Sequence, residues 1–142
     1  MRFAKILAAV DFSEPSREAM RTAAELAADS GAQLTIAHFW QLPLLGAELP
    51  MPGQYIDDLR STSEQQLAEW TAEASKVAGK PVATVFELGA PWDELVKLVR
   101  RDHHDLVVVG THGRTGLKHV LLGSVAEKIV RYAPCTVLVV RR

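Results

Sequence analysis

The sequence is poor in cysteine and has no long hydrophobic run. Its one cysteine, Cys135, has no partner for a disulfide within the chain, which fits a reducing compartment. The first apolar run ends at Asp11, too early for a secretory signal of about 7–15 apolar residues, and no stretch approaches the ~20 residues that cross a bilayer. We therefore expect a cytoplasmic protein that has no membrane partner.

The sequence also lacks a strong net charge, because its formal charge is only -1. This balance hides an asymmetry: residues 1–109 carry 10 Lys or Arg against 16 Asp or Glu, whereas residues 110–142 carry 6 against 1. The segment forms no basic stripe interleaved with aromatic residues of the kind that nucleic-acid binding favours, so we expect no nucleic-acid partner. A small phosphate-bearing ligand needs less positive charge and remains compatible with this segment.

Two common nucleotide-binding motifs are absent as well. In the glycine-rich segment that begins at Gly110, no glycine is followed at the Walker spacing by Gly-Lys-Ser/Thr, and GxGxxG does not occur. The pair His103-His104 has no Cys or further His at ligand spacing, so we expect no metal site. His38 lies within a predicted strand, which favours a core or rim histidine over a ligand.

What the sequence does have is a regular alternation of apolar runs and helical patterns. Its 142 residues, 48% of them hydrophobic, suit one globular domain spanning 1–142. Strands are predicted at 3–10, 33–40, 82–87, 106–109 and 135–140. Helices are predicted from a cap at Ser13 to Gly31, from 56 to Gly79, from Pro91 onward, and around 125–130.

The order of these elements predicts the fold class. Strands alternate with helices, and the strand at 106–109 is apolar without alternation, so both of its faces are expected to be covered. This pattern indicates a single-domain α/β fold, an open twisted parallel sheet with helices on both faces and right-handed crossovers. Residues 41–54 contain three prolines and two glycines, and we expect a long loop there that acts as a lid or interaction segment.

Two of the predicted strands end in unusual residues, and the glycine-rich one of the two lets backbone amides approach an anion. Ligands of open parallel sheets bind beyond the carboxyl ends of the strands, where the strand order reverses. The first strand ends in Val10-Asp11-Phe12-Ser13, and the fourth runs into a segment with glycines at 110, 113 and 116 and with Arg114. Gly123-Ser124 directly precedes the last helix, whose N-terminal amides are suited to holding phosphate.

A purely structural role accounts for the same residues. Ser124 with Glu127 three positions later matches a capping box, and the glycines at 110, 113 and 116 can simply shape a surface loop. The residues alone leave both interpretations open.

The glycine spacing resembles that of the universal stress protein family. Two residues separate Gly110 from Gly113, and nine separate Gly113 from Gly123-Ser124. This spacing, together with segments 10–13 and 134–140, is similar to the ATP-binding branch of that family, and the resemblance covers essentially the whole chain. The resemblance implies a Rossmann-like five-stranded sheet of order 3-2-1-4-5. It also implies ATP, alone or with Mg²⁺, between strands one and four, and a homodimer paired through the last strand.

The resemblance, together with the charge of Arg114, also yields a set of expected cofactor-binding residues. They are Ala9, Val10, Asp11, Phe39, Val109, Gly110, His112, Gly113, Arg114, Gly123, Ser124, Val125 and Ala126. The resemblance directs Asp11 at the ribose or adenine and the backbone of Phe39 at the adenine edge. Nucleotide-binding members often have Thr or Ser where this chain has Ala126, so one hydroxyl contact to phosphate is missing.

These observations predict an ATP-binding regulatory protein of the stress response, acting on protein partners that the sequence does not identify. No catalytic residue is assigned. Two alternatives stay open: a slow ATP hydrolase, with Asp11 and His112 as its only candidate groups, and a nucleotide-independent dimeric interaction module. The β-prone run Thr136 to Val140 would expose unpaired backbone at a sheet edge, which favours a dimer.

Overall fold

The computed structural model describes residues 2–42, 52–112 and 122–141, and it alternates strands with helices through these ranges. The strands are β1 (Lys5–Ala9), β2 (Gln33–Trp40), β3 (Ala83–Leu88), β4 (Leu106–Gly110) and β5 (Thr136–Val140). The helices are α1 (Glu14–Ser30), α2 (Gly53–Ala78), α3 (Pro91–Asp102) and α4 (Ser124–Tyr132).

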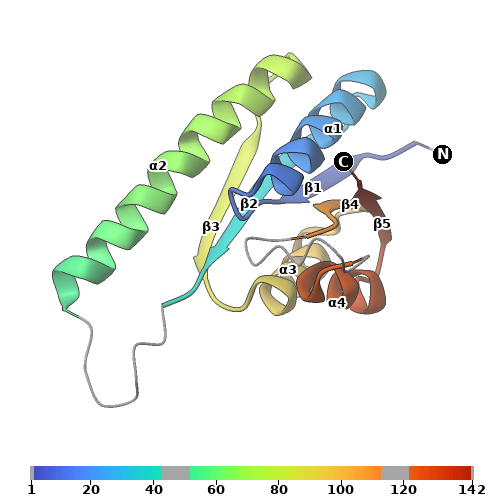
Figure 1. The fold of residues 1–142 in the computed structure, drawn as a ribbon. Helices are drawn as coiled ribbons and strands as arrows, with labels where there is room; N and C mark the ends of the chain where they lie inside the picture. The colour runs from blue at the N-terminus through green and yellow to red at the C-terminus, as the bar shows by residue number, and fades with distance from the viewer. Residues whose placement is uncertain (1, 43–51, 113–121, 142) are drawn as a thin grey trace.

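The five strands form one parallel sheet of order β3-β2-β1-β4-β5, which confirms the expected fold class and strand order. Helices α1 and α2 cover one face, and α3 and α4 cover the other (Figure 1). Strand β1 is central, since Ala8 pairs with Ile36 of β2 on one side and with Val108 of β4 on the other. The strand order reverses between β1 and β4, so the chain leaves these two strands in different directions and a cleft can open beyond their carboxyl ends.

The core lies in two layers, one on each face of the sheet. Ile6 and Ala8 of β1 face the layer of α1 and α2, while Leu7 between them faces the layer of α3 and α4. All three side chains are fully buried. Because both faces are covered, the central strands need apolar residues in succession, as the sequence has at 106–109.

Helix α1 begins and ends where its capping residues predict. The Ser13 side chain accepts a hydrogen bond from the Ser16 amide, and Pro15 stands in the first turn, where its missing N–H costs nothing. Gly31 adopts φ 73° and donates its N–H to Ala27 O, which closes the helix.

Several element boundaries differ from the predictions. Helix α2 begins at Gly53, so Gly53 and Gln54 belong to the helix and not to the predicted loop at 41–54. Most of that loop lies outside the described residues. Strand β3 is displaced by one residue from the predicted 82–87, and β4 extends to Gly110. Within the described ranges, none of the helices combines the length and apolarity needed to cross a bilayer.

Candidate functional site

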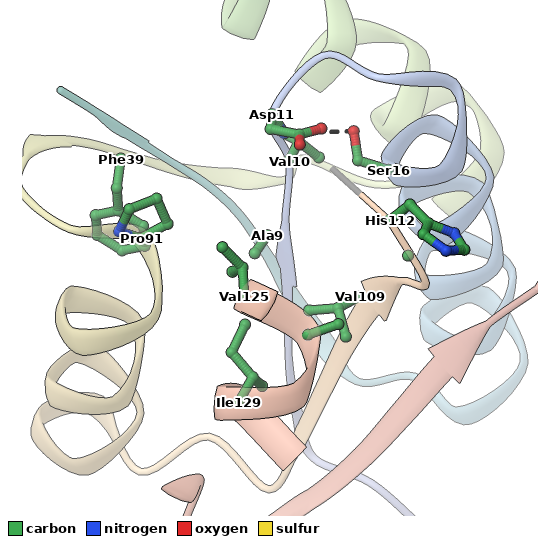
Figure 2. A pocket seen from close by; sticks show the side chains of 12 residues that line it. Ala9, Val10, Asp11, Ser16, Phe39, Pro91, Val109, His112, Val125 and Ile129 are labelled. Carbon is green, nitrogen blue, oxygen red and sulfur yellow. Dashed lines mark hydrogen bonds between the residues drawn. The ribbon is translucent and has the colours of Figure 1, made fainter. Parts of the chain in front are cut away.

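A cleft lies beyond the carboxyl ends of β1 and β4 (Figure 2), with about 560 Å³ of empty space when the solvent at its mouth is included. Its lining residues are Ala9, Val10, Asp11, Ser16, Phe39, Pro91, Val109, Gly110, His112, Val125, Ala126 and Ile129. Eight of these twelve are apolar. A mostly apolar cleft with a few placed polar groups suits a flat heterocycle that carries a polar substituent.

The structure brings most of the expected cofactor-binding residues together. Nine of them line the cleft: Ala9, Val10, Asp11, Phe39, Val109, Gly110, His112, Val125 and Ala126. Gly123 and Ser124 stand at the start of α4 but do not line the cleft. Gly113 and Arg114 lie outside the described residues. Four separate segments therefore meet at one site, at the switch in strand order.

The apolar lining comes from both sides of the point where the strand order reverses. In Figure 2, Phe39 and Pro91 lie on the side of β2 and α3, and Val109, Val125 and Ile129 lie on the side of β4 and α4. The small side chain of Ala9 on β1 lies between these two groups. The width of the apolar part is thus set by how α3 and α4 pack against the same face of the sheet.

The polar end of the cleft is built around Asp11. Its Oδ1 accepts hydrogen bonds from the Ser13 amide at 3.0 Å and from the Ser13 hydroxyl at 2.5 Å. Its own amide donates to Ser16 Oγ at 3.3 Å. The next residue, Phe12, adopts φ 66°, a left-handed conformation that costs roughly 1–2 kcal/mol for a residue with a side chain. The turn that places Asp11 in the cleft is therefore strained and must be held by its surroundings.

The start of α4 is tied to the end of β4. The Gly123 amide donates to Thr111 O at 2.6 Å, which brings the first turn of α4 beside the residues that follow β4. The first amides of a helix lack intrahelical partners and carry its partial positive charge, so this end of α4 is suited to an anion. Ala126, in that first turn, is buried and lines the cleft.

The predicted capping box at Ser124 is wrong. Gly123, with φ -68° and ψ 163°, occupies the N-cap, and Ser124 is the first residue of the helix. A residue within the helix is past the N-cap position, from which a side-chain oxygen accepts a hydrogen bond from the N2 or N3 amide. Gly123 has no side chain with which to cap, so α4 starts without a side-chain cap. This removes one of the structural explanations of the Gly123-Ser124 pair.

At Gly110, by contrast, a packing role is present whatever binds in the cleft. A Cβ at this position would lie 2.7 Å from both C and O of Pro15 and 2.9 Å from its Cβ. These distances are too short for real contacts, and two of the atoms belong to backbone that cannot move aside easily. Glycine is therefore required here because β4 ends directly against the first turn of α1.

Sequence reasoning missed three of the lining residues: Ser16, Pro91 and Ile129. Each lies on a helix: Ser16 and Pro91 in the first turns of α1 and α3, and Ile129 one turn after Val125. The signal for Pro91 was present, since the residue that opens a helix after a parallel strand lies at the carboxyl edge of the sheet. Helix packing, which local patterns do not show, brings Ser16 and Ile129 to the cleft.

The histidines take different positions. His112 lines the cleft, with Nδ1 3.0 Å from Thr111 Oγ1. His38 is buried, which confirms it as a core histidine, and its Nδ1 lies 2.7 Å from Val10 O. His103 ends α3 in an exposed left-handed turn, whereas its neighbour His104 is buried. Among the described residues, no three His, Cys, Asp or Glu side chains gather as a metal site.

Comparison with known proteins points to one family. The model of the universal stress protein family matches residues 2–141. The universal stress protein YxiE of Bacillus subtilis is 30% identical over 147 residues, covering 98% of this chain and 99% of the relative. The solved structure of the hypothetical protein MJ0577 is 27% identical, covers 100% of this chain and 98% of its own, and superposes with a TM-score of 0.88. A universal stress protein crystallised in complex with cAMP is 26% identical, covers 99% and 98%, and gives a TM-score of 0.77.

Proposed function

Because this chain belongs to the universal stress protein family, we propose that it is a stress-response regulatory protein that binds ATP, alone or with Mg²⁺, in the cleft between β1 and β4. The observation that carries the proposal is that four segments, at 9–11, 39, 109–112 and 125–126, each contribute lining residues to this one cleft. A family member 26% identical to this chain has been crystallised with cAMP, which is also an adenine nucleotide.

Each part of ATP finds matching chemistry in the proposed site. The apolar walls around Phe39 and Val125 suit the adenine ring, and the carboxylate of Asp11 suits a ribose hydroxyl as a hydrogen-bond acceptor. The first turn of α4 suits the phosphates because its amides point out of the helix start. The basic segment 110–142, with six Lys or Arg against one acidic residue, adds long-range attraction for a polyanion.

We propose binding in preference to rapid hydrolysis. Phosphoryl transfer needs a carboxylate that holds the metal and a residue that orients water, in addition to a phosphate site. Asp11 is the one carboxylate among the described lining residues, and its Oδ1 already accepts two hydrogen bonds from Ser13. Mg²⁺, when bound, would be held chiefly by phosphate oxygens, with Asp11 as its nearest acidic group.

A homodimer paired through β5 is the second part of the proposal. Strand β5 is the last strand in the sheet order, and one edge of it pairs with β4. None of the residues of β5 is fully buried: Thr136 is exposed and the other four are partly buried. A second copy of β5 would satisfy the backbone groups along this edge. In this arrangement the bound nucleotide and the dimer together form the surface that other proteins recognise.

Thermal unfolding with and without ATP tests the proposal. ATP at a hundred times its dissociation constant should stabilise the protein by about 2.7 kcal/mol, which raises Tm by roughly 8 °C in a domain of this size. We expect Asp11→Asn to reduce this rise. The same change at exposed Asp58 on α2 should leave the rise intact. A parent protein whose Tm does not respond to ATP at millimolar concentration would contradict the proposal.

A further inference from the structure

We infer that His38, which does not line the cleft, is a positioning residue for nucleotide binding: it holds the turn at Val10 to Phe12 that presents Asp11. The inference rests on the proposed function, because it assigns a role within the same site. His38 and Phe39 are adjacent on β2, so their side chains leave opposite faces of the sheet. Phe39 reaches the cleft, and His38 reaches the residues on either side of Asp11.

The first contact is a hydrogen bond to the residue before Asp11. The residue pairing of β1 with β2 ends at Ala9 and Ala37, and the Val10 amide donates the last hydrogen bond from this end of β1, to Ala37 O at 2.9 Å. There the Nδ1 atom of His38 lies 2.7 Å from Val10 O. A carbonyl oxygen can only accept, so Nδ1 carries the hydrogen. His38 is 8% exposed, and a hydrogen bond shielded from water in this way is stronger than a solvated one.

The second contact is a ring contact to the residue after Asp11. The ring centroids of His38 and Phe12 are 4.4 Å apart, and the rings of Phe12 and Trp70 of α2 meet in a T-shaped contact with centroids 5.2 Å apart. Phe86 of β3 stacks on His38 with centroids 6.0 Å apart. The ring of His38 is therefore fixed between two aromatic side chains, and it in turn fixes the ring of Phe12.

These two contacts act on the strained part of the site. Phe12 has φ 66°, and a strained residue keeps its conformation only when its surroundings over-determine it. His38 supplies that constraint from both ends, through the carbonyl of Val10 and the ring of Phe12. An apolar side chain would fill the same space without a polar group to desolvate, so packing alone does not explain a histidine. What histidine adds is the N–H donor.

Three variants separate this role from packing. His38→Phe keeps an aromatic ring but removes the donor, and His38→Asn keeps a short side-chain donor. His104→Phe makes the matched change at another buried histidine, 5% exposed, which precedes the amino end of β4, whereas the cleft lies beyond the carboxyl end of that strand. The dissociation constant for ATP is measured by calorimetry at a temperature at which circular dichroism shows each variant folded.

We expect His38→Phe to weaken ATP binding about tenfold, which corresponds to about 1.4 kcal/mol. His38→Asn should recover most of the loss. His104→Phe should change the melting temperature but not the affinity, since it lies away from the cleft. Unchanged affinity in His38→Phe, in a parent protein that binds ATP, would overturn the role of His38 and leave the proposed function intact. A parent protein that binds no ATP would overturn both.

A second measurement covers the case in which His38→Phe fails to fold. Long-range ¹H–¹⁵N spectra of the imidazole rings in the parent protein report which nitrogen carries the hydrogen. A protonated Nδ1 in His38 supports the hydrogen bond to Val10 O. A neutral ring protonated only at Nε2 has no donor for that carbonyl and would overturn the inference without reference to ATP.

Discussion

At Gly110 the absence of a single side chain decides how closely β4 approaches α1. The residue was expected to matter because its backbone leaves room for an anion, and it does line the cleft. The space that a Cβ would need, however, is occupied by the backbone of Pro15. The same glycine thus allows β4 to pack closely against α1, and its presence in the sequence is not by itself evidence of ligand binding.

Gly110→Ala should destabilise the protein by about 1–3 kcal/mol, which is typical of an overpacked site that must shift. The physical reason is that the new methyl group would meet backbone atoms at 2.7 Å. Gly53→Ala is the matched control, because nothing lies within 4 Å of its added Cβ and its position is helical. This control should be neutral or slightly stabilising. Urea unfolding of both variants checks the prediction, and equal midpoints would contradict it.

Among the elements, β5 and β3 form the two edges of the sheet but differ in what covers them. Helix α2, 26 residues long, packs against β2 and β3 and lies alongside β3 in Figure 1. Strand β5 has α1 and the short α4 against its two faces. Neither strand has a fully buried residue, since every position in both is exposed or partly buried, so burial alone does not distinguish the edge at which a second copy would pair.

A lysine placed on each edge strand distinguishes them. Thr136→Lys on β5 and Thr84→Lys on β3 make the same change at exposed positions. If two copies pair through β5, Thr136→Lys places a lysine on the paired edge of each copy, and edge lysines oppose strand pairing, so the change should raise the dimer dissociation constant about tenfold or more. Thr84→Lys should leave it unchanged. Light scattering after size exclusion, over a range of concentrations, measures the mass against 15.6 kDa per chain. The reverse order of effects would place the interface at β3.

For the whole molecule, one buried titratable group links stability to pH. His104 is buried where α3 leads into β4, and its pKa is lowered below the ordinary value of 6.5, chiefly by burial and next by the charge of Lys5. The unfolded chain therefore binds a proton at His104 at a higher pH than the folded chain does. Below pH 6.5 this difference favours the unfolded state and lowers the free energy of unfolding. The lowering is complete once the pH falls below the pKa of His104 in the folded chain.

We therefore expect the free energy of unfolding to fall as the pH is lowered from 7.5 through 6.5 toward 5. His104→Phe should flatten this part of the profile, because it removes the group that titrates. His103→Asn is the control, since His103 is exposed and asparagine tolerates the left-handed conformation found there. Urea unfolding at several pH values measures the profile. A slope that persists in His104→Phe would assign the pH dependence to other groups.

Most of the element order could be predicted because it depends on short-range patterns. The caps at Ser13 and Gly31 bounded α1 correctly, and β2 was predicted at its observed bounds. Patterns failed where the signal was weak or ambiguous. Gly53 was assigned to a loop because it follows the prolines concentrated in 41–54, and Ser124 resembled an N-cap although Gly123 occupies that position.

The site was predicted in part, because its residues come from strand ends that the sequence marks. Nine of the expected residues share the cleft, and their contacts with ATP remain a prediction, as does the whole contribution of Gly113 and Arg114. Ser16 and Ile129 could not be found, since the packing of α1 and α4 brings them there. The strand order itself followed from family resemblance, as apolar runs carry no information about which strands are neighbours.

The sequence by itself determined the alternation of strands and helices, the coverage of both sheet faces and the position of the polar and glycine-rich strand ends. These properties depend on residues a few positions apart, within reach of one helical turn or one strand. Only the tertiary structure decided that β4 ends against Pro15, that α4 starts beside Thr111 and that His38 reaches Val10 O. Such contacts join segments far apart along the chain, and they exist only once the sheet has ordered its strands and the helices have packed on it.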